Sequence, residues 1–269
     1  MNEPRFPTSL GMSTTSTITL LGEDLARDLM GKVSLTELVH RMVTLRVPSP
    51  GQVRMLDACL LALADHGFTP TAIAARLTYL SAPDSVQGAM AAGLLGGGSR
   101  FLGVTEDCGQ FLATTVTELP ELPTDDKGWD DTARTLVRRE RTERRLIPGL
   151  GHPVHKELDP RTPALIEIAH EENCYGPHLA LFEAIGRVHE EVLGRRLVLN
   201  GAGAVGAALA DLGLPPQLLR GFALFARAAG LLGQLAEELR MPVGMDTYLM
   251  VERNAVFVDP ATLTEDDGG

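Results

Sequence analysis

The sequence predicts an all-α protein, and three observations support this prediction. Apolar residues recur at three- and four-residue spacing through most of the chain, which is the period of one helix face. Proline and glycine stand between these segments, as in 48–51 and 96–98, where they end one helix or open the next. Only 196–200 and 255–259 have the composition of β-strands, and both segments are short.

The expected helices follow one another along the chain, with the longest connections at 118–130 and 147–161. The segment 34–43 is typical, because a Ser-Leu-Thr-Glu capping box opens it and one apolar face follows. The segment 131–146 is strongly charged and is expected to be a solvated helix with ion pairs between successive turns. The remaining helical patterns cover 22–31, 53–63, 70–80, 85–95, 105–117, 162–172, 178–194, 203–212 and 216–239.

Composition restricts the class of protein. The chain has 269 residues, 44% of them hydrophobic, which suits one large or two smaller globular domains. Its net charge of −11 argues against a nucleic-acid partner, because a phosphate backbone requires a basic face. No apolar run is long enough to span a bilayer and the N-terminus lacks a secretory signal, so no membrane association is expected. Residues 1–17 are expected to form a disordered lead-in.

The three cysteines, Cys59, Cys108 and Cys174, are widely spaced and form no Cys-x-x-Cys motif. They fit neither a disulfide framework nor a zinc site. We therefore expect a protein of the reducing cytoplasm, without a bound metal.

The segment 146–161, Leu-Ile-Pro-Gly-Leu-Gly-His-Pro-Val-His-Lys-Glu-Leu-Asp-Pro-Arg, is the first candidate for a site. Its prolines and glycines prevent a regular helix, so it is expected to be a loop. It brings together His152, His155, Lys156 and Arg161. Loops often contain binding and catalytic residues, although a solvated linker that contains histidine is an equally good interpretation of this segment alone.

A second glycine-rich segment, Asn-Gly-Ala-Gly-Ala-Val-Gly at 200–206, has some likeness to a dinucleotide-binding motif. Such a motif requires a buried strand before it, a helix after it and a downstream acid. No such surroundings are present, so we discount this interpretation.

The order and spacing of four stretches resemble the citrate synthase superfamily, most closely its short citryl-CoA lyase-like members. The third of these stretches, Pro-Gly-Leu-Gly-His-Pro-Val-His-Lys-Glu-Leu-Asp-Pro-Arg, is similar to the family pattern P-G-F-G-H-R-V-Y-K-x-x-D-P-R. The resemblance extends over nearly the whole chain, from about residue 18 to about residue 238. The four stretches are 28–51, 64–76, 148–161, and 199–216 with 225–238.

This resemblance implies a two-domain helical fold, with 18–104 and 197–269 in a large domain and 105–196 in a small domain. It also implies a homodimer with its active site in the cleft between the domains. The implied activity makes or breaks a carbon–carbon bond next to a coenzyme A (CoA) thioester. The substrates would then be an acyl-CoA and a small carboxylate, with no permanently bound cofactor.

Residue roles transfer from the family only where the motifs match. His152 matches the histidine on the carbonyl or hydroxyl group of the second substrate, and Arg161 and Arg227 match arginines that bind carboxylates. Lys156 matches a basic residue near the CoA phosphates. The segment that would cradle the adenine end of CoA is Pro148, Gly149, Leu150 and Gly151.

The sequence departs from the family at catalytic positions. Leu102 stands where the family has a histidine that bonds the thioester oxygen, and Ala202 stands at the aspartate that removes a proton. Leu63 replaces a further substrate-contacting histidine. Because Leu and Ala neither accept nor donate protons, other groups would have to substitute. The candidates for this role are Asp65, His66, Glu106 and Asn200.

Three hypotheses follow from these observations. The first is a citryl-CoA lyase-like or citrate synthase-like enzyme with an altered catalytic set. The second is a non-catalytic homologue that binds CoA esters or a carboxylate, or that supports a partner subunit. The third is different acyl-CoA chemistry in the same cleft, such as decarboxylation or hydrolysis.

Overall fold

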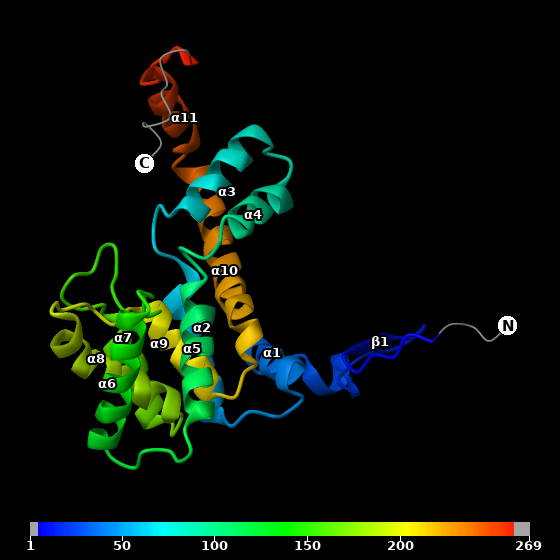
Figure 1. Ribbon diagram of the computed structural model, residues 1–269. Coiled ribbons are helices and arrows are strands. Elements are labelled where there is room, and N and C mark those ends of the chain that lie inside the picture. Colours follow the sequence, from blue (N-terminus) through cyan, green and yellow to red (C-terminus); the bar gives the residue numbers. More distant parts are fainter. Residues whose placement is uncertain (1–4, 261–269) are drawn as a thin grey trace. The chain divides into compact units, whose positions relative to one another are not determined.

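The computed structural model describes residues 5–260 and confirms the all-α prediction (Figure 1). The helices expected between 34 and 239 are present with ends shifted by a few residues, 22–31 is only partly helical, and one further helix follows at the C-terminal end. They are α1(Leu35–Thr44), α2(Pro50–Ala64), α3(Pro70–Ser81), α4(Val86–Leu95), α5(Val104–Glu118), α6(Asp126–Thr142), α7(Arg161–Glu171), α8(Pro177–Leu193), α9(Gly201–Asp211), α10(Leu219–Arg240) and α11(Gly244–Arg253). A π-helical turn, η1(Leu25–Leu29), and a 3-10 turn, η2(Pro216–Leu218), complete the helical part.

Side-chain caps explain where several helices begin. The Ser34 side chain accepts a hydrogen bond from the Glu37 N–H, as the capping box predicts. The Asp125 carboxylate accepts one from the Gly128 N–H, so the charged helix α6 begins at Asp126, five residues before the expected start. Asp125 is a short polar residue of the kind that begins helices, so the expected start at 131 was too late.

The described chain divides into two compact units, which are considered separately below. The first consists of residues 5–63 and 99–226, and the second of 64–98 and 227–260. These divisions do not coincide with the domain limits expected from the family resemblance, 18–104 with 197–269 and 105–196, which stay a prediction.

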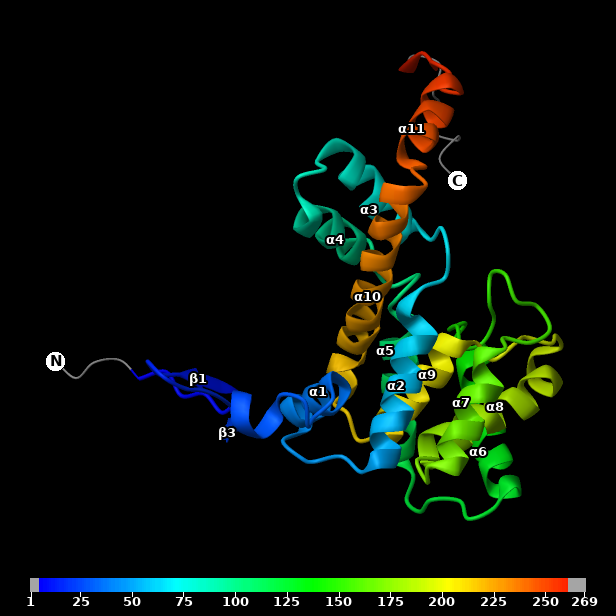
Figure 2. The same ribbon diagram turned by 180° about the vertical axis from the view of Figure 1, so that it is seen from behind.

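Helix α9 is the centre of the first unit, with α5, α7 and α8 packed around it (Figures 1 and 2). All its residues are buried except Ala202 and Asp211, which are partly exposed. A Cβ atom added at Gly206 would collide with the Thr105 carbonyl oxygen of α5. The glycines of 200–206 therefore serve close helix packing and not dinucleotide binding, which explains their spacing.

The second unit has a smaller core between α3, α4 and the later part of α10. Its fully or nearly fully buried apolar residues are Ala75, Ala89, Leu231 and Leu235. Beside them lies Arg76, only 1% exposed, which donates to Gln234 (2.9 Å) and Glu238 (2.8 Å). Glu238 also accepts the backbone N–H groups of Val243 and Gly244, so this buried ion pair fixes the start of α11.

The N-terminal segment differs from the expectation. Three short strands, β1(Gly11–Ser13), β2(Ile18–Leu20) and β3(Glu23–Asp24), form an antiparallel sheet with Gly11 paired to Leu20, and the sheet projects from the helices of its unit (Figure 2). The disordered lead-in at 1–17 is therefore wrong for 11–13, because β2 supplies backbone partners that composition does not reveal. Residues 1–4 lie outside the described residues.

Two further expectations about local structure are wrong. The segments 196–200 and 255–259 do not form strands, apart from one isolated bridge between Leu150 and Leu199. Their β-branched residues lack a neighbouring strand to pair with, and strand propensity depends on such a neighbour. Helix α11 was not expected, and its apolar residues Met245, Tyr248, Met250 and Val251 are all about half exposed or more.

The segment Pro216–Arg240 is long and apolar enough to cross a membrane by length and composition. Half of its most apolar window is buried inside the protein, as is common for the core helix of a globular protein. Arg220 and Arg227 interrupt this segment, so the sequence contains no uninterrupted apolar run there.

We predict that Asp211→Ala lowers the free energy of unfolding by about 3 kcal/mol. The buried Asp211 carboxylate accepts the first N–H groups of α8, from Gly176 (3.1 Å), His178 (3.0 Å) and Leu179 (2.9 Å), and the substitution leaves them without an acceptor. Urea unfolding measures the change. The exposed Asp84→Ala is the control and is expected to stay within about 0.5 kcal/mol of the parent. A loss equal to that of the control would contradict the capping role.

Candidate functional site

The loop between α6 and α7 lies against the N-terminal end of α9. The Gly151 N–H donates to the Val198 carbonyl (2.6 Å), and the Asn200 N–H donates to the Gly149 carbonyl (2.9 Å). The Thr162 hydroxyl donates to the Leu199 carbonyl (3.0 Å) and so fixes the far end of the loop. Both ends of the segment are therefore bonded to the first unit, while residues 153–154 and 156–158 between them are exposed, and its role as a site stays a prediction.

Two glycines make this path possible. Gly149 and Gly151 have φ angles of +85° and +96°, which side-chain-bearing residues rarely adopt. At Gly149 an added Cβ would also lie 2.8 Å from the Phe182 ring and 2.9 Å from the Cys108 sulfur. Both glycines are therefore needed for the chain to turn at this place.

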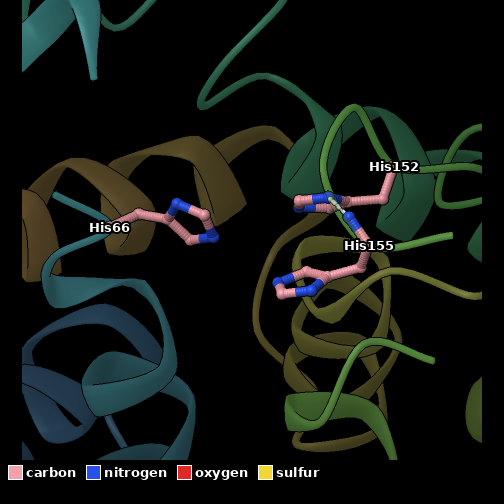
Figure 3. A group of neighbouring side chains, drawn as sticks. All are labelled: His66, His152 and His155. Atoms are coloured by element: carbon pink, nitrogen blue, oxygen red, sulfur yellow. Dashed lines mark hydrogen bonds between the residues drawn. The ribbon is translucent and has the colours of Figure 1, made fainter. Parts of the chain in front are cut away.

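His152 is held through its own ring nitrogen. Its Nδ1 accepts the backbone N–H groups of Val154 (3.0 Å) and His155 (2.9 Å), and its ring lies against the ring of His155 with centroids 4.5 Å apart (Figure 3). A nitrogen that accepts two N–H groups carries no proton. The neutral imidazole therefore has its proton on Nε2, where it can donate a hydrogen bond to an oxygen atom.

Lys156 follows His152 on the exposed side of the loop. Its ammonium group donates to the His152 carbonyl oxygen (3.0 Å), and the side chain is exposed. Several peptide groups of 148–151 are engaged inside the protein. The Leu150 N–H donates to the Ile147 carbonyl (3.2 Å), the Gly151 N–H donates to the Val198 carbonyl, and the Gly149 carbonyl accepts the Asn200 N–H. Contact of Lys156 and of this segment with CoA stays a prediction.

Asp159 and Arg161 form an ion pair beside the N-terminal end of α9, with the carboxylate buried and the guanidinium partly exposed. Arg161 donates to both carboxylate oxygens of Asp159 (3.0 and 2.8 Å), and its third bond goes to the Ala62 carbonyl (3.1 Å). Asp159 also accepts the Gly201 N–H (2.7 Å), the first of α9, where the helix dipole favours a negative charge. Burial opposes ionisation of the Asp159 carboxyl, but these bonds outweigh it, and the pKa is lowered to about 2.

Arg161 also has a structural role, because it is paired with Asp159 and bonded to the Ala62 carbonyl. Three of its N–H groups are committed to Asp159 and Ala62, so a substrate carboxylate would have to use the others. The carboxylate-binding role stays a prediction. Sequence analysis did not single out Asp159, although it stands in the same Asp-Pro-Arg motif.

Asn200 caps α9 and bonds to the loop at the same time. Its side-chain oxygen accepts the Gly203 N–H (2.8 Å), and its amide nitrogen donates to the Gly151 carbonyl (2.7 Å). Only 8% of the residue is exposed. A catalytic role for Asn200 stays a prediction, and it would have to operate with both side-chain groups already engaged.

Asp65, His66 and Arg227 belong to the second unit. The Asp65 carboxylate accepts the Gln234 amide (2.9 Å) and the Gly67 N–H (2.8 Å), and lies 3.6 Å from the Arg227 guanidinium. Arg227 is buried and His66 is exposed. The structure thus brings Asp65 and Arg227 together, as an ion pair, while their catalytic and substrate-binding roles and that of His66 stay predictions.

Comparison with known proteins decides the family. Residues 10–244 match the family model described as "Citrate synthase, C-terminal domain". The chain belongs to the citrate synthase family. Citrate synthase from Deinococcus radiodurans is 27% identical over 199 residues, which cover 70% of this chain and 48% of that protein. The citrate synthase of Synechocystis is 25% identical over 209 residues, and the chain spans about half the length of both relatives.

Solved structures agree with this assignment. The structure of citryl-CoA lyase from Hydrogenobacter thermophilus has a TM-score of 0.82 and 28% identity, and the match covers 98% of this chain and 99% of that one. ATP citrate lyase from Methanothrix soehngenii, solved with citrate and coenzyme A, has a TM-score of 0.77 and 19% identity. The match covers all of this chain and 44% of that one, and at this identity it shows the shared fold alone.

The aliphatic residues at expected catalytic positions of the citrate synthase family are buried or packed against the core. Leu63 and Leu102 are each 5% exposed, and Ala202 is the second residue of α9, packed on the core of the first unit. Ala202 is followed by Gly203, whose N–H the Asn200 cap engages, so the helix end at this position is stabilised without an acid at 202. That these positions are catalytic in relatives stays a prediction from the resemblance.

We predict that Asp159 contributes about 2 kcal/mol of stability at neutral pH, through a folded pKa of about 2 against an ordinary value of 3.8. Because the folded pKa is depressed, this contribution is present above about pH 4 and is lost as the pH falls toward 2. The difference in unfolding free energy between the parent and Asp159→Asn should therefore shrink between pH 6 and pH 2.5.

Urea unfolding at several pH values measures this difference. The exposed Glu167→Gln is the matched control, and its difference from the parent should stay small throughout. A difference for Asp159→Asn that does not change with pH would show that the carboxylate is not ionised as described.

Proposed function

We propose that this chain is an enzyme that cleaves or forms a carbon–carbon bond next to a CoA thioester, in the manner of citryl-CoA lyase and citrate synthase. The observation on which the proposal depends is the hydrogen bonding of His152, whose Nδ1 accepts two backbone N–H groups. This arrangement places the ring proton on Nε2, and His152 matches the family's histidine on the second substrate. Donors fixed before the reaction begins are the groups that stabilise developing negative charge most effectively.

The cleavage direction is the more specific part of the proposal. In cleavage of a citryl thioester, the bond between the hydroxyl-bearing carbon and the thioester α-carbon breaks. The hydroxyl group loses its proton and becomes a ketone, and the electron pair of the broken bond goes to the α-carbon, which then takes up a proton. The His152 N–H would stabilise the oxygen as its proton leaves. The match with a citryl-CoA lyase over nearly the full length of both chains supports this direction.

The substrates and surroundings follow from the same proposal. The substrate would be a CoA thioester with a carboxylate on the acyl group, and CoA would leave as a product ester and not remain as a bound cofactor. The family resemblance supports a homodimer. The three cysteines are free and buried, in keeping with the reducing environment of the cytoplasm.

A non-catalytic CoA-ester-binding homologue is the second candidate. It is favoured by Leu102 and Ala202, since neither side chain can transfer a proton or donate to an enolate oxygen. Other acyl-CoA chemistry, such as decarboxylation or hydrolysis, would also be compatible with these side chains. The three candidates differ in what they release from citryl-CoA. The lyase releases acetyl-CoA and oxaloacetate, the non-catalytic homologue releases nothing, and an enzyme with other acyl-CoA chemistry releases other products.

We predict that the protein releases oxaloacetate and acetyl-CoA from citryl-CoA and that His152→Ala lowers kcat by about 10²–10³-fold, because the oxygen loses its donor. Oxaloacetate is measured by coupled reduction with malate dehydrogenase. The control is His170→Ala, an exposed histidine of α7 in the same unit, which should retain parental turnover. Binding of citryl-CoA in calorimetry without any product would favour the non-catalytic homologue, and equal activity of both variants would exclude His152 as the donor.

Lys156 supplies a separate prediction about CoA. Removal of its exposed ammonium group in Lys156→Ala should weaken binding of free CoA about fivefold, as expected for about 1 kcal/mol from one exposed contact with a phosphate. Isothermal calorimetry measures this binding. Lys127→Ala, an exposed lysine in the first turn of α6, is the control with the same change in charge. An equal effect of both variants would mean that only net charge matters.

A further inference from the structure

We propose that Asn200 is a positioning residue for His152, which it orients through the peptide group that precedes the histidine. The inference rests on the proposed function, in which His152 is the hydrogen-bond donor to the substrate. It gives Asn200 a role other than direct participation in proton transfer.

The first step of the argument is that all four polar groups of Asn200 are engaged. Its backbone N–H donates to the Gly149 carbonyl (2.9 Å), and its backbone carbonyl accepts the Ala204 N–H (3.0 Å). Its side chain bonds Gly203 with the oxygen and Gly151 with the nitrogen. Asn200 is thus fixed in helix α9 and in the loop at once, and it is almost fully buried.

The second step concerns Gly151, the residue directly before His152. Its N–H is bonded to the Val198 carbonyl (2.6 Å) and its carbonyl to the Asn200 amide (2.7 Å). The carbonyl of Gly151 belongs to the same planar peptide group as the His152 N–H. A bond to this carbonyl therefore fixes the orientation of the peptide plane that leads into His152. Without it, Gly151, with its φ of +96°, could adopt many other backbone conformations, because glycine has no side chain.

The third step is that the bonds from the His152 ring to Val154 and His155 lie within the loop. The Lys156 bond to the His152 carbonyl also lies within the loop, whereas the Asn200 bond to the Gly151 carbonyl comes from helix α9. Bonds within the loop keep its shape but allow it to move as a body. The Asn200 bond connects that shape to helix α9, which is buried in the core.

The identity of the residue follows from the two bonds. An asparagine supplies an acceptor for the helix cap and a donor for the loop carbonyl in one short side chain. Aspartate keeps the acceptor but has no donor, and its second oxygen would face the Gly151 carbonyl. Serine is a good helix cap but has no second group to reach the loop. These two substitutions therefore separate the positioning bond from the capping bond.

The test uses the full chain with Asn200→Asp and Asn200→Ser and two measurements. The first is the ¹⁵N NMR spectrum of imidazole-labelled protein, in which the His152 signals are assigned by their loss in His152→Ala. The parent should show an unprotonated Nδ1 and a protonated Nε2. In both variants these signals should shift and broaden, because the loop keeps its internal bonds but is no longer held to α9 through the Gly151 carbonyl. The second is steady-state cleavage of citryl-CoA, where kcat should fall about 10–100-fold with KM changed by less than about threefold.

The matched control is Asn254→Asp. The Asn254 amide also donates to a carbonyl, that of Met250 (2.7 Å), but on the exposed end of α11 in the other unit. This variant should keep the parental His152 spectrum and the parental kcat. Asn200→Ser should keep a urea midpoint close to the parental value, since the helix cap remains.

Unchanged His152 nitrogen signals in both Asn200 variants would overturn the proposal, as would loss of stability with an unaltered His152 spectrum in the folded protein. Absence of turnover in the parent would instead contradict the proposed function. In that case the nitrogen signals, which require no substrate, still decide whether Asn200 positions His152.

Discussion

The arrangement of the candidate site depends on one buried carboxylate. Asp159 is fully buried, and it is held ionised by the Arg161 guanidinium and by the first N–H of α9. A carboxylate in this place would be costly without these partners, because burial removes it from water. Together with these partners, Asp159 connects the end of the loop to the start of α9. This connection and the bonds of Asn200 fix the backbone path between Gly149 and Arg161.

Helix α9 suits this role because it is made of small residues. Gly203 and Gly206 allow the loop and helix α5 to approach the α9 backbone closely, and the other residues of the helix are buried almost throughout. A helix packed so closely has few ways to shift, since interiors are filled at the density of organic crystals. The loop bonds therefore attach the segment before His152 to a closely packed helix of the first unit.

Much of this could be predicted from the sequence, for identifiable reasons. Apolar spacing and caps such as Ser34 and Asp125 act locally, so the all-α class and the approximate limits of α1 to α10 followed from them. The order of four motifs was specific enough to give the family. The strand β1 was not predicted, because the composition of 11–13 does not reveal its pairing with β2, and helix α11 was not predicted either.

The sequence by itself determined the residues of the loop, its inability to form a helix and its likeness to the citrate synthase family, because these depend on residue type and order. Only the tertiary structure decided what each polar group faces. It gave Arg161 a buried carboxylate partner, engaged Asn200 in two bonds and assigned the proton of neutral His152 to Nε2. The physical reason is that hydrogen bonds are directional over about 3 Å, so roles depend on distances between residues far apart in the chain.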